Sequence, residues 1–370
     1  MTIGTLDSNG LWLGRIERGG IGPSVVTLRN GRIIDITSKT APTVRDILER
    51  DDEADHVRNA QGEDIGPLDA DHQWLAPCDL QAVKACGVTF AGSMVERVIE
   101  EQAAGDPAKA DAIRARIGDR IGDSLSNIVP GSDAAAEVKE ALIAEGLWSQ
   151  YLEVGIGPDA EVFSKAQVLS SVGFGSEIGL HQISTWNNPE PEVVLAVTSK
   201  GEIKGATLGN DVNLRDVEGR SALLLSKAKD NNASCAIGPM IRLFDDGFTL
   251  DDVRQAELAL TVTGSDGFVL NGSSSMSQIS RDPADLVKQT IGRHHQYPDG
   301  LMLFLGTLFA PTQDRDTPGG GFTHKIGDVV TISNTRLGAL TNTVRLSTEC
   351  PEWSFGASHL MRNLAHRGLL

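Results

Sequence analysis

Three acidic residues are spaced so that they could form a metal site. Glu190 and Glu192 are two residues apart beside an apolar run, so on a strand both side chains point to the same face. Asp211 follows the next apolar segment of the chain. If a two-residue loop, Lys200-Gly201, joins the two segments as a hairpin, Asp211 lies opposite Glu190.

Carboxylates held this close repel one another unless a cation neutralises them. Oxygen-only ligands favour a hard ion, so the spacing predicts a Mg²⁺ site, with Mn²⁺ or Ca²⁺ as alternatives. A solvated acidic hairpin without an ion is the other interpretation of the same residues. A bulge in either strand would also shift the pairing.

Composition limits the classes of partner. The chain of 370 residues has a formal net charge of −17 and no cluster of basic residues, which argues against nucleic acid or an anionic membrane as a partner. A small anionic substrate stays compatible with this composition, because a metal and local basic groups override net charge.

No apolar run approaches the ~18 residues that span a bilayer, and no signal peptide is recognisable. The four cysteines form no CxxC pair, so we expect a cytoplasmic protein with free thiols; a nucleophilic Cys235 is the alternative.

The pattern of strands and helices predicts an α+β fold that is mostly β. Residues 1–70 form a small N-terminal β-rich lobe and a linker, and residues 71–370 form the main domain. The main helical region, at about 93–148, is an insertion that could serve as a lid, as a dimer surface or as plain scaffold. Expected strands of the main domain include 256–263, 301–305, 328–332 and 340–346. Neither a GxGxxG motif after a strand nor a P-loop is present.

The acidic residues and the blocks that follow them resemble the fumarylacetoacetate hydrolase family. That family has Glu-x-Glu on a strand, then an Asp in a turn, a Lys before a Gly-Pro, and a late Gly-Thr. The matching residues here are Glu190, Glu192, Asp211, Lys229 before Gly238-Pro239, and Gly306-Thr307. The resemblance covers roughly residues 75–350. It implies a mixed β-sandwich roll whose catalytic domain is 71–370, assembled as a homodimer or a higher homo-oligomer.

A second motif separates branches of this family. Its hydrolases carry Tyr-x-x-His-x-x-Glu, in which His and Glu activate a water. The stretch from Phe90 to Glu96 keeps Glu96 but has Ser93 at the His position, and a serine hydroxyl needs a base of its own to activate water. The chain is therefore more similar to the dehydratase branch, which acts on 2-keto-3-deoxy sugar acids. Blocks with the same similarity are Lys84–Phe90, Trp148–Glu153, Asn187–Glu192 and His295–Gly300.

The resemblance implies a Mg²⁺-dependent lyase of pentose catabolism. Its substrate is a 2-keto-3-deoxy-pentonate derived from D-xylonate or D-arabinonate, and its product is 2-oxoglutarate semialdehyde. The alternatives are a metal-dependent hydrolase of 2,4-diketo acids such as acylpyruvates, and a catalytically silent protein that binds a metal and a keto acid.

The resemblance also implies roles for six residues besides the metal ligands. The catalytic candidates are Lys229, Glu96 and Glu161, and the substrate-binding candidates are Ser93, Lys165 and Thr307. Lys229 either stabilises an enolate or acts as a base if its pKa is lowered. Ser93 and Glu96 also fit a helix capping box, with Ser93 as the N-cap, so both have a structural alternative.

Overall fold

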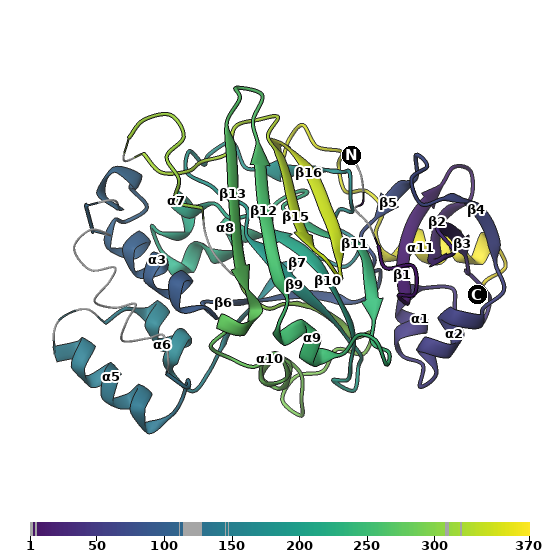
Figure 1. The fold of residues 1–370 in the computed structure, drawn as a ribbon, viewed down its shortest axis with the longest axis horizontal. Coiled ribbons are helices and arrows are strands. Elements are labelled where there is room, and N and C mark those ends of the chain that lie inside the picture. The colour runs from purple at the N-terminus through teal and green to yellow at the C-terminus, as the bar shows by residue number, and fades with distance from the viewer. Residues whose placement is uncertain are drawn as a thin grey trace.

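The computed structural model describes residues 3, 6–110, 112–113, 128–144, 146, 148–307, 311–318 and 320–370. Within these ranges the strands form two sheets (Figure 1). The larger sheet has the order β4-β3-β2-β1-β11-β10-β9-β14-β6-β7, with β5 paired to β1. Its strands are β1 (Trp12–Arg18), β2 (Gly22–Arg29), β3 (Arg32–Asp35), β4 (Glu63–Pro67), β5 (Gln73–Leu75), β6 (Ala82–Gly87), β7 (Glu161–Ala166), β9 (Pro191–Val197), β10 (Ile203–Asp211), β11 (Cys235–Leu243) and β14 (Leu301–Phe304).

The smaller sheet has the order β13-β12-β15-β16-β8. Its strands are β8 (Glu177–Leu180), β12 (Glu257–Thr263), β13 (Val269–Ser275), β15 (Val329–Asn334) and β16 (Gly338–Leu346). The described helices are α1 (Val44–Leu48), α2 (Glu53–Asn59), α3 (Ala91–Gln102), α5 (Asp133–Ala144), α6 (Gln150–Ile156), α7 (Arg215–Glu218), α8 (Leu225–Lys229), α9 (Leu250–Arg254), α10 (Pro283–Thr290) and α11 (Ala357–His366), with 3₁₀ turns η1 (Ala222–Leu224) and η2 (Met276–Gln278). The prediction of an α+β fold dominated by strands is confirmed.

The core lies on both faces of the larger sheet, and β9 shows why. Along this strand Leu195 packs into the cluster shared with Leu260 of β12 and Ile332 of β15, whereas Val194 packs into the cluster that holds Ile47 of α1. A strand that is covered on both faces has a continuous run of apolar residues in its sequence. In agreement with this, every residue of β9 is buried. Such a strand gives the acidic residues at its start a rigid support.

The hairpin from β9 to β10 has the pairing expected at its acidic end, although its loop differs from the prediction. The two-residue loop is wrong: Thr198 N–H donates to Glu202 O at 2.9 Å, which leaves a three-residue loop with Gly201 at a φ of +81°. A bulge between Ile203 and Gly205 then shifts the register back. Asp211 N–H therefore donates to Glu190 O at 3.1 Å, as the sequence predicted for these two residues.

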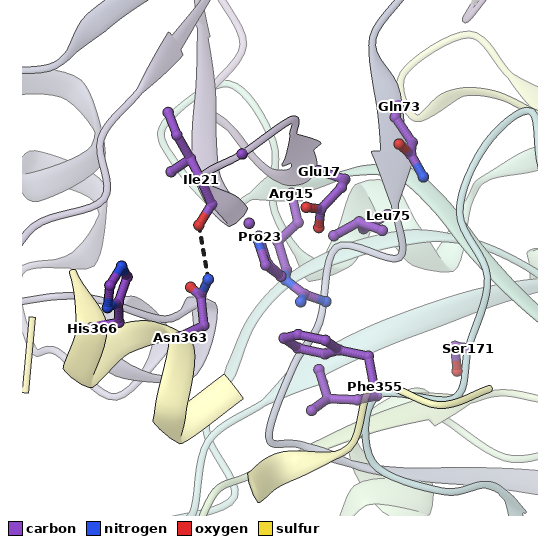
Figure 2. Close-up of a pocket in the computed structure, with 13 residues that line it drawn as sticks. Arg15, Glu17, Ile21, Pro23, Gln73, Leu75, Ser171, Phe355, Asn363 and His366 are labelled. Atoms are coloured by element: carbon purple, nitrogen blue, oxygen red, sulfur yellow. Dashed lines mark hydrogen bonds between the residues drawn. The ribbon is translucent and has the colours of Figure 1, made fainter. Parts of the chain in front are cut away.

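The N-terminal strands continue the larger sheet, because β1 pairs with β11. They lie at one end of the molecule together with α1, α2 and α11 (Figure 1). Helix α11 is tied to them by Asn363 Nδ2, which donates to Ile21 O at 2.8 Å beside a cavity of about 530 Å³ (Figure 2). None of the predicted site residues is among the described residues that line this cavity. The division of the chain at residue 70 stays a prediction.

Helices α3, α5 and α6 lie at the opposite end of the molecule (Figure 1). Helices α3 and α5 overlap the region predicted as a helical insertion at 93–148, and α6 follows that region. Of the predicted region, residues 111, 114–127, 145 and 147 lie outside the described residues. In α3 and α6 the apolar side chains share a small core of their own, which includes Met94, Val98 and Leu152. Across the described ranges, no helix combines the length and apolar character needed to cross a membrane.

A buried ion pair fixes the segment before β15. Asp328 accepts from Arg315 Nη1 at 2.6 Å and Nη2 at 2.7 Å, and its Oδ2 lies 3.2 Å from His324 Nδ1. Burial alone would raise the pKa of Asp328, but the hydrogen bonds from Arg315 and His324 lower it to about 2. His324 thus has a structural partner. Neither it nor another histidine is among the described residues that line the acidic pocket, which is the pocket that contains Glu190, Glu192 and Asp211.

We expect Asp328→Asn to lower the free energy of unfolding by about 3 kcal/mol, because it removes the buried carboxylate from the Arg315 guanidinium, which keeps only the more exposed Asp266 as a charge partner. The measurement is the midpoint of urea unfolding, with Asp251→Asn as the control, since Asp251 pairs with Arg254 while its side chain is 85% exposed. The folded-state pKa lies below the reference value of 3.8, so the wild type has this stabilisation above about pH 4 and loses it as the pH falls towards 2. Equal midpoints for the two variants would contradict the prediction.

Candidate metal and acid–base site

The three predicted ligands come together at the start of β9 and the end of β10. Glu190, Glu192 and Asp211 are each at most 2% exposed, and one carboxylate oxygen from each lies within 4.8 Å of the others. Glu192 Oε2 also accepts the backbone N–H of Gly306 at 2.7 Å. Burial raises the pKa of Glu192, and the neighbouring carboxylates of Asp211 and Glu190 raise it further.

This donor set fits a hard divalent cation. It offers oxygen ligands only, and its buried carboxylates are so close that ionising all three requires nearby positive charge. A hydrated Mg²⁺ held by one to three carboxylates keeps positions for water or substrate oxygens. The residues that would hold the ion are Glu190, Glu192 and Asp211.

Basic side chains surround the same carboxylates. Lys229 Nζ donates to Glu190 Oε2 and, at 3.0 Å, to Asp211 Oδ2. Lys165 Nζ lies 2.7 Å from Asp211 Oδ1, and Arg97 Nη2 donates to Glu190 Oε1 at 2.5 Å. Although burial alone would raise the pKa of Asp211, Lys165 and Lys229 lower it. The cluster is therefore nearly balanced in charge.

Lys229 is held in place through its backbone as well as its side chain. Its carbonyl accepts from Lys165 Nζ and, at 2.8 Å, from Ser234 Oγ. Burial alone would lower the pKa of Lys229, but Asp211 and Glu190 raise it above the usual value. The alternative in which Lys229 acts as a base with a lowered pKa is not supported, because acidic neighbours face it and keep it an ammonium ion.

Glu161 lies at the start of β7, where it pairs with Gly87 at the end of β6. Burial raises the pKa of Glu161 to about 7; the carboxylate of Glu218 adds to the shift, while Arg97 and Lys229 oppose it. A carboxyl group with a pKa near neutrality suits proton transfer in either direction. Glu161 lines the same pocket as the three candidate ligands, Lys229 and Thr307.

Gly87 makes room for the Glu161 carboxyl group. A Cβ at position 87 would lie 1.9 Å from Glu161 Oε2 and 2.7 Å from its Cδ. Any larger residue must therefore push the carboxyl group away from the strand.

We expect Gly87→Ala to lower turnover by about 10²-fold, because a displacement of about 1 Å is enough to cost that much in a positioned catalytic group. Unfolding free energy should change by less than about 1 kcal/mol, because the displaced atoms are the end of a flexible side chain. Steady-state kinetics and urea unfolding measure the two effects. A matched control is Gly19→Ala, at a glycine without a positive φ whose added Cβ would meet nothing within 4 Å. Full activity of Gly87→Ala would contradict the assignment of Glu161.

Ser93 and Thr307 both line the pocket, but the capping role considered for Ser93 is wrong. Helix α3 begins after Phe90, which is its N-cap, and Ser93 Oγ donates to Phe90 O at 2.9 Å from inside the helix. The helix begins there because Phe90 is buried and forms a bridge with Ile279. Thr307 follows Gly306, whose φ of +99° lets its N–H reach Glu192.

Glu96 forms an ion pair with Arg215. Its Oε2 accepts from Arg215 Nη2 at 3.1 Å, and Arg215 also donates to Glu100 and stacks on Trp186. Glu96 is absent from the described residues that line the pocket. The structure thus brings Glu161, Lys229, Lys165, Ser93 and Thr307 to the carboxylate cluster but does not bring Glu96 there.

Sequence reasoning missed Arg97, Glu218 and Gly87. Arg97 lies one helical turn after Ser93, a spacing that places both on one face of α3. Glu218 follows Arg215 by three residues in α7 and is brought to the pocket by the fold alone. The free thiol of Cys235 is buried and burial raises its pKa to about 12, so it is not a nucleophile near neutral pH.

Comparison with known proteins agrees with this site. Residues 185–345 match the family described as Fumarylacetoacetate (FAA) hydrolase C-terminal, a range that holds all three candidate metal ligands. Residues 185–345 are therefore similar to the C-terminal domain of that family.

Two curated relatives are more specific. The chain is 32% identical over 194 residues to a probable 2-keto-3-deoxyxylonate dehydratase of Haloferax volcanii, covering 52% of this chain and 63% of that protein. It is 29% identical over 185 residues to a 2-dehydro-3-deoxy-D-arabinonate dehydratase of Saccharolobus solfataricus, covering 50% of this chain and 58% of that protein. The matched segments thus span about 60% of the length of these relatives.

Solved structures show the same fold. A 2-keto-3-deoxy-D-arabinonate dehydratase in its apo form superposes with a TM-score of 0.63 at 21% identity, covering 90% of this chain and 99% of that chain. The same enzyme complexed with magnesium and 2,5-dioxopentanoate gives a TM-score of 0.61 at 22% identity, again with 90% and 99% coverage. The prediction of a fumarylacetoacetate-hydrolase-like fold is confirmed.

Proposed function

We propose that this protein is a Mg²⁺-dependent dehydratase that converts a 2-keto-3-deoxy-pentonate to 2,5-dioxopentanoate, which is 2-oxoglutarate semialdehyde. The observation that carries the proposal is one buried pocket that combines three kinds of group. These are the three carboxylates that could hold a metal ion, the ammonium group of Lys229, and the carboxyl group of Glu161, whose pKa is near neutrality. The similarity to two dehydratases named for such substrates supports it. We further propose that the protein acts in pentose catabolism in the cytoplasm, where its four free cysteines suit a reducing compartment.

The residues of the pocket have distinct tasks in this reaction. A bound Mg²⁺ would polarise the C2 carbonyl and so acidify the C3 protons. The Lys229 ammonium group stabilises negative charge that develops on the C2 oxygen. Glu161 exchanges protons with the leaving C4 hydroxyl, and Ser93 and Thr307 supply hydroxyl groups for the substrate. Lys165, which is fully buried and donates to Val212 O, fixes Asp211 rather than reaching the substrate.

The proposal is tested with metal-stripped protein and 2-keto-3-deoxy-D-xylonate, with and without added Mg²⁺. Formation of the semialdehyde is followed with an NAD(P)⁺-dependent aldehyde dehydrogenase, and pyruvate is assayed in parallel. The expected result is Mg²⁺-dependent semialdehyde without pyruvate. Turnover of an acylpyruvate with release of pyruvate would instead establish the 2,4-diketo acid hydrolase, which Ser93 in the place of a histidine disfavours.

We also propose a homodimer or a higher homo-oligomer that uses the outer face of the smaller sheet, over which none of the described helices lies (Figure 1). Over its centre the exposed or half-buried side chains alternate with buried ones and are uncharged: Ala259, Thr261, Thr263, Val269, Asn271, Ser273, Thr331 and Ser333. Charged side chains of this face lie at its margins, with Glu257 at the start of β12 and the pair of Arg345 and Glu177 on β16 and β8. Two copies of a chain with a net charge of −17 meet with least repulsion where the face carries few charges. Light scattering of the wild type and of Thr261→Glu tests this, and an unchanged mass in the variant would count against the face.

A further inference from the structure

Glu218 lines the acidic pocket, yet the reaction outlined above gives it no task. We propose that Glu218 is the catalytic base that removes the C3 proton, and that it works opposite Glu161; this inference rests on the proposed dehydratase function. Its evidence is the position of the side chain, the way it is held, and the number of proton transfers that the reaction requires.

Glu218 is buried and is held by an ion pair with Arg97. It ends the short helix α7 and is 3% exposed. Its Oε2 lies 3.0 Å from Arg97 Nη1, so the two side chains form an ion pair. The geometry does not make a hydrogen bond, and among the described residues Oε2 has no other hydrogen-bond partner. A buried carboxylate oxygen that faces a pocket with its hydrogen-bonding capacity unused is available to a substrate proton.

Two neighbouring acidic side chains, Glu100 and Glu96, form hydrogen bonds with arginines. Glu100 accepts from Arg97 Nη1 at 2.7 Å and from Arg215 Nε at 2.6 Å. Glu96 accepts from Arg215, as described above. Neither is among the described residues that line the pocket, whereas Glu218 is. Of these three carboxylates, Glu218 is therefore the one placed for chemistry.

Arg97 connects this base to the metal site. One guanidinium group contacts Glu190 Oε1 at 2.5 Å through Nη2 and Glu218 Oε2 at 3.0 Å through Nη1. Because the guanidinium is planar and rigid, it fixes the position of Glu218 relative to a candidate metal ligand. Arg97 is a positioning residue in this arrangement, and it belongs to a helix that no sequence motif connected with Glu218.

The reaction requires two groups that transfer protons. In the elimination, Glu218 takes a proton from C3, a C3–C4 double bond forms, the C4–O bond breaks, and Glu161 gives its proton to the hydroxyl that leaves as water. Glu161, now ionised, then takes a proton from C5 while Glu218 returns its proton to C3, which moves the double bond to C4–C5. The resulting enol tautomerises in water to the aldehyde. One water is lost, and both carboxyl groups regain their starting protonation states.

The environments of the two groups support this division. Burial raises the pKa of Glu161 to about 7, so a large fraction of it is protonated at neutral pH and able to act first as an acid. Glu218 is the anionic partner of Arg97 and is able to act first as a base. Two carboxyl groups in contrasting environments are a recurring arrangement for acid–base pairs.

The experiment compares Glu218→Gln with Glu161→Gln in D₂O, using 2-keto-3-deoxy-D-xylonate and Mg²⁺. Dehydration is measured by the coupled assay, and exchange of the C3 protons for deuterium is measured by NMR. We expect Glu218→Gln to lose both dehydration and C3 exchange by about 10²-fold or more, because the base is absent. Glu161→Gln should lose dehydration by a similar factor but keep C3 exchange, because its base remains.

Glu100→Gln is the matched control, since it also removes a carboxylate partner of Arg97 but one outside the pocket lining. If Glu100→Gln and Glu218→Gln lose C3 exchange equally, Glu218 acts only by holding Arg97 in position, and the proposal is overturned. C3 exchange in Glu218→Gln within about threefold of wild type would overturn it as well. If Glu218→Gln does not fold, as judged by its thermal midpoint, Glu218→Asp tests the same point, with reduced exchange expected.

The wild type separates this inference from the proposed function. Wild-type protein that exchanges C3 protons without releasing water would refute the dehydratase, while the variants would still decide which residue is the base. Wild-type protein that neither exchanges C3 protons nor dehydrates the substrate would overturn both proposals.

Discussion

Replacement of Glu161 by glutamine is expected to lower turnover of the 2-keto-3-deoxy-pentonate by about 10²–10⁴-fold. Glutamine has nearly the same shape but cannot give a proton to the leaving hydroxyl. Glu161 is not one of the three carboxylates that would hold the ion, so the dissociation constant for Mg²⁺ should stay within about threefold of the wild-type value. Coupled-assay kinetics and titration calorimetry with Mg²⁺ measure the two quantities.

The matched control is Glu96→Gln, the other carboxyl group that the sequence put forward. Glu96 contacts Arg215 rather than the metal-ligand candidates, so its variant should lose less activity than Glu161→Gln. A larger loss in Glu96→Gln than in Glu161→Gln would reverse the assignment.

The pH dependence gives a second check on Glu161. The charged groups around it are Glu218 of α7 and Glu190 before β9, which raise its pKa, and Arg97 of α3 and Lys229 of α8, which lower it. Because an acid must carry its proton, turnover should fall as the pH rises through about 7. Glu161→Gln should lack this decline in its residual activity. Turnover that instead rises through the same range would make Glu161 the first base.

The candidate metal site was predictable from the sequence, because its three carboxylates come from two strands of one hairpin. The spacing of Glu190 and Glu192 follows from the two-residue period of a strand, and Asp211 follows from pairing across one hairpin. The loop prediction failed by one residue, but the bulge before Gly205 compensated for it. Neighbouring β strands keep register over short distances, so an error at the turn did not spread to the acidic end.

The acid–base residues depend on contacts between distant segments, so their arrangement could not be predicted from local spacing. Glu161 and Lys165 entered only through family resemblance, and Glu96 was placed by its motif without regard to Arg215. Arg97 connects α3, α7 and the start of β9, a juxtaposition that no local period encodes. Gly87 matters only because Glu161 lies against it on the next strand, which requires the pairing of β6 with β7.

Replacement of Lys229 by methionine is expected to have opposite effects on metal binding and on catalysis. In the structure its ammonium group contacts Glu190 and Asp211, two of the three side chains that would hold the ion. A divalent ion must therefore compete with this ammonium group for the same carboxylates and is repelled by its charge. Lys229→Met should bind Mg²⁺ at least about tenfold more tightly, which is about 1.4 kcal/mol, and should lose turnover by about 10²-fold.

Stability without the ion gives an independent measure of the same competition. With Lys229 removed, Glu190 and Asp211 lose a buried partner, so the metal-free variant should unfold at a lower temperature than the metal-free wild type. Mg²⁺ should then raise its melting temperature by more than it raises that of the wild type. Lys227→Met is the control, because it removes one charge from the exposed side of the same helix. Weaker Mg²⁺ binding in Lys229→Met would show that the lysine assists the ion instead of competing with it, and that the ammonium group leaves these carboxylates before the metal arrives.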